Sequence, residues 1–172
     1  DHNIEMLNKL ETPTYNIKYI LKMTYQDLIQ LSLSELEFIK SAEPSETGGL
    51  AYYLEFKVGA CIMISKNIDI NDKLVIGRVG RLMKFKLNSE SIVLAIYVKL
   101  DDGEAGCINK NSNLICREND WVIIERVESI FSMKKKFSNS PSIQRTQFPL
   151  MLSWACTCHK FQGFKLTVCC YY

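Results

Sequence analysis

Hydrophobic and polar positions follow a helical period at the start of the chain and a mainly alternating pattern after it. Apolar residues at steps of three predict a short helix over residues 1–11, and alternation predicts a strand over 17–23. A capping-box pattern of Ser34 with Glu37 predicts a second helix that runs to about Ala42. The first part of the chain therefore mixes helix and strand.

The pattern changes after residues 43–49, which are rich in turn-forming residues and indicate a boundary. Short runs of Val, Ile and aromatic residues then alternate with turn chemistry, which predicts strands at 60–65, 73–86, 92–100 and 121–130. Gly77 and Gly80 within one run predict a bulge or a sharp bend, as closure of a barrel requires. These features favour a small antiparallel barrel, with a basic loop at 134–142 leaving it.

The last residues return to a helical period. Leu150, Trp154 and Cys158 lie at steps of four and predict a helix that ends near Gly163. The uncharged segment 166–172 predicts a buried strand. We therefore expect an α/β protein in which two flanks surround a small β-barrel.

Composition and charge exclude some classes of protein and indicate one kind of partner. With 172 residues, 47% of them hydrophobic, and a near-neutral charge, the chain can bury a core and is not a disordered segment. The longest charge-free apolar stretch, Phe148 to Cys158, is too short to cross a membrane, and the opening residues lack the apolar core of a signal peptide. Residues 129–172 carry six Lys or Arg and no acid, which indicates a polyanion partner or, alternatively, a basic surface that only maintains solubility.

Seven cysteines without a secretory signal indicate an intracellular protein with reduced thiols. Zinc is disfavoured, because the C-x-C spacing of Cys156 and Cys158 differs from that of structural sites, and the helical period makes Cys158 a core residue. We expect neither a metal site nor a catalytic residue. The acidic run 101–104 could bind a metal but is better interpreted as a charged hairpin loop. Four aromatic residues could stack on bases, but most of them are interpreted as core: Tyr52, Tyr53, Tyr97 and Trp121.

Polar groups gather at the predicted end of the last helix, at Thr157, His159, Lys160, Gln162 and Gly163. A hydroxyl, an imidazole, an ammonium and an amide there can bind phosphate, and a glycine lets the backbone approach an anion closely. The alternative is an ordinary helix end with a C-terminal Lys and Gly.

Two blocks of the sequence, residues 56–80 and 147–163, together resemble the petite-integration-frequency DNA helicases, which are superfamily-one, five-prime-to-three-prime enzymes that include Helitron-transposon helicases. The second block is similar to their motif V: Gln147-Phe-Pro-Leu-x-Leu-x-Trp-Ala, then Thr-x-His-Lys-x-Gln-Gly163. The first consists of Phe56-Lys-Val-Gly-Ala60, Met63, Asn67-Ile-Asp69, Leu74-Val75 and Gly77 to Gly80. Val98-Lys-Leu-Asp-Asp102 and Arg145-Thr-Gln-Phe-Pro149 also fit in order, so that the resemblance covers about residues 50–168.

The resemblance implies part of a RecA-like (P-loop NTPase) motor domain that carries an SH3-like barrel. Residues 1–56 and 145–172 would belong to the motor domain, and 57–144 would form the inserted barrel. By position in motif V, three residues would contact single-stranded DNA (Thr157, His159, Lys160) and two would lie near ATP (Gln162, Gly163). The family further implies ATP and Mg²⁺ as cofactors of the complete helicase, a nuclear or mitochondrial location, and roles in DNA repair, recombination and telomere maintenance.

Departures and absences limit what this chain does alone. Phe161 places a ring at a DNA-facing position, Cys158 and Phe164-Lys165 also differ from the family, and Ile76 stands where the family has Asn. The sequence has no Gly-x-x-x-x-Gly-Lys-Ser/Thr loop, no acidic pair for Mg²⁺ and no arginine-bearing motif VI, all of which phosphoryl transfer needs. We therefore expect no ATP hydrolysis without the missing N-terminal motor domain. The alternatives are a non-catalytic nucleic-acid-binding module and an inactive transposon-derived remnant.

Overall fold

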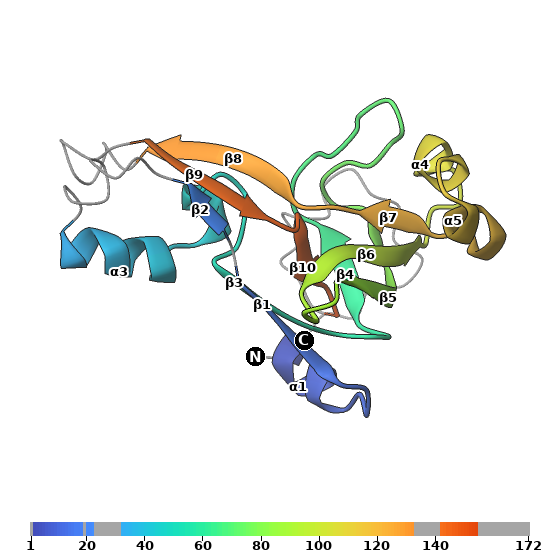
Figure 1. Ribbon diagram of the computed structural model, residues 1–172, viewed down its shortest axis with the longest axis horizontal. Helices are drawn as coiled ribbons and strands as arrows, with labels where there is room; N and C mark the ends of the chain where they lie inside the picture. Colours follow the sequence, from blue (N-terminus) through green and yellow to red (C-terminus); the bar gives the residue numbers. More distant parts are fainter. Residues whose placement is uncertain (1, 19, 23–31, 133–141, 155–172) are drawn as a thin grey trace.

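The computed structural model describes residues 2–18, 20–22, 32–132 and 142–154, which form a strand-rich, mixed α/β fold with three antiparallel sheets (Figure 1). The helical elements are α1 (His2–Asn8), α3 (Leu33–Ser41), the 3-10 turn η1 (Pro44–Glu46), α4 (Cys107–Asn111) and α5 (Leu114–Asn119). The strands are β1 (Thr14–Lys18), β2 (Ile20–Lys22), β3 (Tyr53–Lys57), β4 (Cys61–Ile64), β5 (Val79–Leu87), β6 (Val93–Leu100), β7 (Val122–Ile124), β8 (Val127–Ser132), β9 (Ser142–Gln147) and β10 (Leu150–Leu152).

The first predicted helix is confirmed by α1, and the predicted strand at 17–23 is realised as β1 and β2. These two strands belong to different sheets, because β1 pairs with β3 whereas β2 pairs with β9. The chain thus passes from one sheet to another between Lys18 and Ile20.

The second predicted helix exists as α3, but its capping box is formed by Ser32 and Glu35 and not by Ser34 and Glu37. The Ser32 hydroxyl accepts from the Glu35 N–H at 3.3 Å, and the Glu35 carboxylate accepts from the Ser32 N–H at 2.8 Å. Both pairs have the required spacing, and Ser32 has the extended backbone of an N-cap, so α3 begins two residues earlier than predicted. Its end at the C-cap Ala42 agrees with the prediction.

The central sheet has the order β10-β4-β5-β6-β7 and is open in the described part of the chain, so the predicted closed barrel is not seen there. The predicted run at 73–86 forms a strand only from Val79, and the run at 121–130 divides into β7 and β8. The β5–β6 register shifts between Leu82 and Lys84 and again between Lys86 and Leu87, and not at Gly80. The alternative prediction of a sharp bend is confirmed at Gly77, which lies in a turn with φ +91°. The strand positions were thus predicted better than their pairing.

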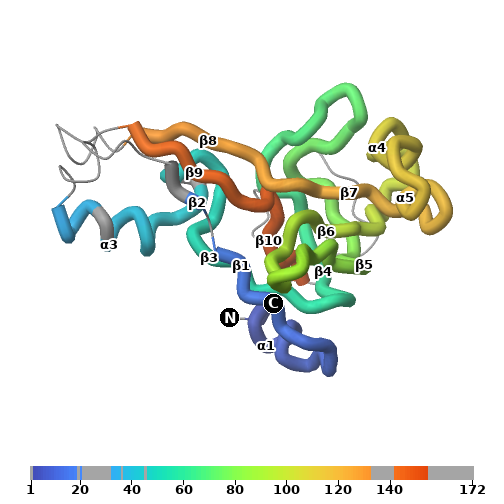
Figure 2. Tube along the Cα trace, viewed as in Figure 1, coloured from blue at the N-terminus to red at the C-terminus, as the bar shows by residue number. Residues whose placement is uncertain are grey.

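The predicted helix from Leu150 is wrong at its start, because Leu150–Leu152 form β10, which pairs with Ile62–Ile64 of β4 (Figure 2). The ladder to β4 satisfies backbone groups that a helix would have satisfied within itself. The rest of that helix, with Cys158 and Gly163, the strand predicted at 166–172, and most of the loop at 134–142 lie outside the described residues. The polar stretch at 101–120, for which no helix was predicted, contains α4 and α5.

One hydrophobic core joins α1, β1 and β3 to the central sheet. Leu7, Ile17 and Phe56 are buried in the same cluster as Ile96 and Phe148. The ring centroids of Tyr15 and Phe85 are 4.1 Å apart at its edge. None of the helices in the described part of the chain has the length and apolar content needed to cross a bilayer.

Candidate functional site

The five residues predicted to contact DNA or ATP (Thr157, His159, Lys160, Gln162, Gly163) all lie outside the described residues. The structure instead shows how the chain is held before it reaches them. The two sequence blocks that carry the helicase resemblance meet in one sheet, because β10 of the second block pairs with β4 of the first, and β4 pairs with β5. Ser65 N donates to Pro149 O at 2.8 Å and Ser153 N donates to Cys61 O at 3.0 Å, which extends this contact at both ends of β10.

The turn between β9 and β10 is fixed by the buried side chain of Gln147. Its Nε2 donates to Ile17 O at 3.3 Å, and its Oε1 accepts from Phe148 N at 3.0 Å. Arg126 donates to the same Oε1 at 3.2 Å and to Lys18 O at 3.0 Å, and its guanidinium lies 4.7 Å from the centroid of the buried Phe148 ring. Burial lowers the pKa of Arg126, although an arginine remains charged in proteins. The turn is therefore tied to β1 as well as to β9.

Arg145 on β9 is fully buried and links β9 to α3 and to the turn after η1. Its Nη1 donates to Thr47 Oγ1 at 2.9 Å and to Leu50 O at 2.8 Å, and its Nη2 donates to Ile39 O at 2.7 Å. The Phe131 ring centroid lies 5.1 Å from the guanidinium carbon. A buried charge is tolerated only with such partners, so Arg145 fixes the position of the strand that leads to β10.

Two glycines of the first block have structural roles. A Cβ atom at Gly80 would lie 2.4 Å from the carbonyl oxygen of Lys99 on β6, so that a side chain does not fit between β5 and β6 there. Gly77 has φ +91°, which glycine adopts easily, and its N–H donates to Ile64 O at 2.9 Å. Gly80 thus permits the close pairing of β5 with β6, and Gly77 extends the hydrogen bonding of β4 just before β5 begins.

The polar residues of the first block close the loop between β4 and β5. Asn67 Oδ1 accepts from Ile76 N at 2.8 Å, and Asp69 Oδ1 accepts from the backbone N–H groups of Asn71 at 2.9 Å and Asp72 at 3.2 Å. Ile76 contributes only its backbone to this arrangement, and its side chain is 51% exposed. The helicase family has Asn at the position of Ile76. Because Ile76 takes part only through its backbone N–H, this difference leaves the hydrogen bond to Asn67 in place.

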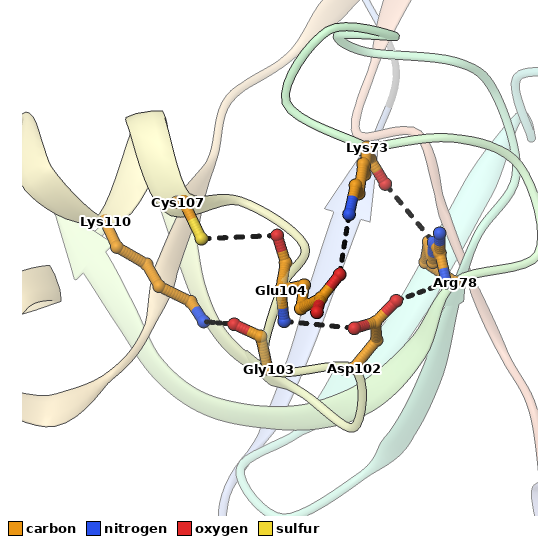
Figure 3. A network of polar contacts seen from close by, with 7 residues as sticks. All are labelled: Lys73, Arg78, Asp102, Gly103, Glu104, Cys107 and Lys110. Carbon is orange, nitrogen blue, oxygen red and sulfur yellow. Dashed lines mark hydrogen bonds and ion pairs between the residues drawn. The ribbon is translucent and has the colours of Figure 1, made fainter.

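Charged residues connect this loop to the segment before α4, as Figure 3 shows. Lys73 Nζ lies 2.7 Å from Glu104 Oε2, and Arg78 Nη1 lies 2.5 Å from Asp102 Oδ2. The Glu104 carboxylate raises the pKa of Lys73. The Arg78–Asp102 pair is half-buried, whereas the Lys73–Glu104 pair is exposed and contributes little stability. No group of three metal-ligating side chains occurs within the described ranges. The segment at 101–104, predicted as a charged hairpin loop, is the turn that leads from β6 to α4.

Asp72 is 4% exposed, and its carboxylate caps α4 from a distant loop, accepting from Ile108 N at 2.7 Å and from Asn109 N at 2.9 Å. We expect Asp72→Ala to lower the free energy of unfolding by about 1–2 kcal/mol, because two helix N–H groups lose their acceptor. Urea denaturation measures this. Glu118→Ala, at an exposed position of α5, is the control and should change stability by less than about 0.5 kcal/mol; equal effects would contradict the capping role.

The aromatic residues considered for base stacking divide by burial. Tyr97 is 3% exposed and pairs with the partly buried Trp121, with ring centroids 6.2 Å apart. Tyr53 is exposed on β3, and its hydroxyl donates to Asn16 Oδ1. Of the four residues, only Tyr97 is buried; Tyr52 and Trp121 are half-buried, so the prediction that most of the group belongs to the core is confirmed only for Tyr97.

The described cysteines differ in accessibility. Cys107 is exposed, whereas burial raises the pKa of the half-buried Cys61 and of the buried Cys116. Because the thiolate is the nucleophile, we expect iodoacetamide near pH 8 to alkylate Cys107 at least about tenfold faster than Cys116. Peptide mass spectrometry gives the rate at each site, and unfolding in urea should equalise the rates. Similar rates in the folded protein would contradict the burial of Cys116.

Comparison with known proteins relates the whole arrangement to one class of enzyme, although no protein-family profile matches the chain. The ATP-dependent DNA helicase PIF1 of Xenopus laevis is 26% identical over 113 residues, which are 66% of this chain and 14% of that protein. This chain therefore spans about a seventh of the length of that relative.

Solved structures give the same relationship at the level of fold. The Pif1 helicase of Candida albicans superposes with a TM-score of 0.57 at 19% identity, covering 94% of this chain and 33% of that one. A Bacteroides Pif1 bound to single-stranded DNA superposes with a TM-score of 0.54 at 20% identity, covering 96% of this chain and 30% of that one. The matches thus take in nearly all of this chain and about a third of each enzyme.

Proposed function

We propose, from the distant relationship of this chain to part of the Pif1 helicases, that it is part of an ATP-dependent DNA helicase that translocates on and unwinds DNA. Its contribution is contact with the backbone of single-stranded DNA and the coupling of that contact to ATP. The other motor domain supplies the phosphate loop and the Mg²⁺-binding acids, which this sequence lacks. Such an enzyme acts in the nucleus or the mitochondrion.

The observation that carries the proposal is the meeting of the two helicase-like blocks in one sheet. The blocks are more than 60 residues apart in the sequence, yet β10 pairs directly with β4. A chance likeness of two short segments does not require them to be neighbours, whereas two parts of one functional unit must be. The buried Arg145 and Gln147 hold the second block in this position.

The proposed division follows the resemblance to the helicase family. Residues 1–56 and 145–172 are assigned to a RecA-like motor domain, and 57–144 to an inserted SH3-like barrel. The barrel would contain β4 to β7 of the central sheet, whereas β10, the fifth strand of that sheet, would belong to the motor domain. The antiparallel pairing of β4 to β7 supports an insertion of its own strand order, because RecA-type sheets are built from parallel strands connected by helices. The chain would then return to the motor domain at residue 145, before β10.

The chemistry is proposed for the segment that follows Trp154. Lys160 places a positive charge, and Thr157 and His159 place hydrogen-bond donors, against phosphates of single-stranded DNA. Gln162 and Gly163 lie near the phosphates of ATP bound in the complete helicase. Contacts of this kind position the strand and carry no base information.

Lys160→Ala tests this assignment. We expect about three- to tenfold weaker binding of labelled oligo-dT and a salt slope reduced by about 0.7, because one phosphate contact is lost. Fluorescence anisotropy at several salt concentrations measures both quantities. Lys40→Ala, at an exposed position of α3, removes the same charge elsewhere and should leave the slope unchanged. Identical behaviour of the two variants would contradict the role of Lys160.

A second candidate function is a non-catalytic nucleic-acid-binding module, favoured by the acid-free C-terminal residues and by the missing phosphate loop. An inactive helicase remnant is the third. A reading frame that continues upstream into a Gly-Lys-Ser/Thr loop separates the helicase from both. The salt dependence of binding then separates the module from the remnant, since only a nucleic-acid binder loses affinity as salt rises.

A further inference from the structure

Four exposed cations lie on one face of the two longest strands of the central sheet. In the β5–β6 register, Arg81 is opposite Lys99, Lys84 is opposite Tyr97 and Lys86 is opposite Ala95. The partners on β6 alternate in sequence, so these side chains share a face, while Leu82 and Phe85 point to the core on the other face. We call Arg81, Lys84, Lys86 and Lys99 the basic face; all four are exposed.

The positive charge of the basic face is not balanced within the sheet. Neither β5 nor β6 contains an Asp or Glu. Among the described residues, no acid makes an ion pair with the basic face, and Arg81 Nη1 donates to the backbone oxygen of Gly59 at 3.1 Å. Asp120, whose pKa Lys99 helps to lower, has its ion pair with Lys110 at 2.8 Å. Arg81 and Lys99 are therefore like charges directly opposite each other, an arrangement that destabilises a sheet.

We propose that the basic face binds the phosphate backbone of duplex DNA, as a contact separate from the one assigned to Lys160. From Arg81 to Lys86 the strand rises by about 15 Å, which is enough to span several phosphates of one strand. Tyr97, the aromatic residue between the cations, is 3% exposed and offers no ring on which a base could stack. Single-strand binders combine charge with such stacking, whereas a duplex presents only its backbone and grooves. The chemistry of this face therefore fits paired DNA better than single strands.

The test compares two charge-matched double variants of the full chain. Lys84→Gln/Lys86→Gln removes two charges from the basic face, and Lys40→Gln/Arg117→Gln removes two exposed charges elsewhere. Binding of a labelled duplex and of labelled oligo-dT is measured by anisotropy against salt, with thermal melts to verify folding. We expect the first variant to bind the duplex at least about tenfold more weakly, with a salt slope smaller by about 1.8, and to bind oligo-dT unchanged.

Each outcome separates this proposal from the proposed function. Equal duplex binding by the two folded variants overturns the basic face as a duplex site and leaves the Lys160 assignment standing. A loss confined to oligo-dT overturns it too, because the face would then bind single strands. Binding of both variants to vesicles of anionic phospholipid is measured in parallel, and a loss confined to the vesicles overturns the proposal, because the face would then bind a membrane surface. If Lys160→Ala weakens the binding of oligo-dT and leaves the binding of the duplex unchanged, the chain has two separate DNA contacts, as proposed.

Discussion

Replacing Arg145 by methionine is expected to lower the free energy of unfolding by about 3–4 kcal/mol, one of the largest losses that a single side chain of this protein can produce. The guanidinium is fully buried and donates to Thr47, Leu50 and Ile39. Methionine fills much of the same volume but donates no hydrogen bond, so buried acceptors on α3 and on the turn after η1 lose their partner. Urea denaturation followed by circular dichroism measures the change.

The control for Arg145→Met is Arg117→Met on α5, where the arginine is exposed. That change should alter stability by less than about 0.5 kcal/mol, because no buried group depends on it. If both variants were equally stable, the hydrogen bonds between β9 and α3 would contribute nothing, and the position of the second helicase-like block would need another explanation.

Gly80→Ala is expected to destabilise the protein by about 3 kcal/mol, because overpacking against backbone is relieved only by moving a strand. The added Cβ would lie 2.4 Å from Lys99 O and 2.9 Å from Leu100 Cα, and both of these atoms belong to the backbone of β6. No side-chain rotation removes this clash. The β5–β6 pairing, which also forms the basic face, should therefore separate locally, and duplex binding should weaken with it.

Gly103→Ala is the matched control for Gly80→Ala. No atom lies within 4 Å of a Cβ at Gly103, in the turn before α4. We expect a change in the free energy of unfolding within about 0.5 kcal/mol, or slight stabilisation, since alanine restricts the unfolded chain. Thermal and urea unfolding of both variants give the comparison. A loss at Gly80 no larger than that at Gly103 would mean that β5 and β6 do not pack as closely as described.

The parts of the fold that depend on neighbouring residues were predictable from the sequence. Helix α1 and the strands at 60–65 and 92–100 follow from the spacing of apolar residues, and the structure confirms them. The capping box was displaced by two residues because Ser32 with Glu35 and Ser34 with Glu37 have the same spacing. Local chemistry alone does not choose between them.

The features that were missed depend on residues far apart in the sequence. The helix α4 begins where Asp72, from the loop after β4, caps it, and no spacing rule connects Asp72 with Ile108. Leu150–Leu152 form a strand instead of a helix because β4 is available to pair with them. The central sheet is open in the described residues, although a closed barrel was predicted. Closure depends on which strands pair with each other, and the pattern of apolar residues does not specify that pairing.

The contacts that hold the segment before the candidate site could not be predicted from the sequence. Arg145 and Gln147 belong to a segment that resembles the helicases, yet their role in holding β9 and the turn to β10 depends on acceptors at Ile39 and Ile17. The motif residues themselves, from Thr157 to Gly163, lie outside the described residues, and their roles stay a prediction. The comparison with Pif1 helicases concerns the chain as a whole and not these residues.

Contact with single-stranded DNA is the central claim, and the most direct test is fluorescence anisotropy of labelled oligo-dT of about 20 nucleotides titrated with the unmodified chain at two salt concentrations. We expect saturable binding at about 50 mM salt that weakens at least about tenfold at about 200 mM, as release of counterions from several phosphates requires. An absence of binding at the lower salt concentration, or binding that does not change with salt, would contradict the claim.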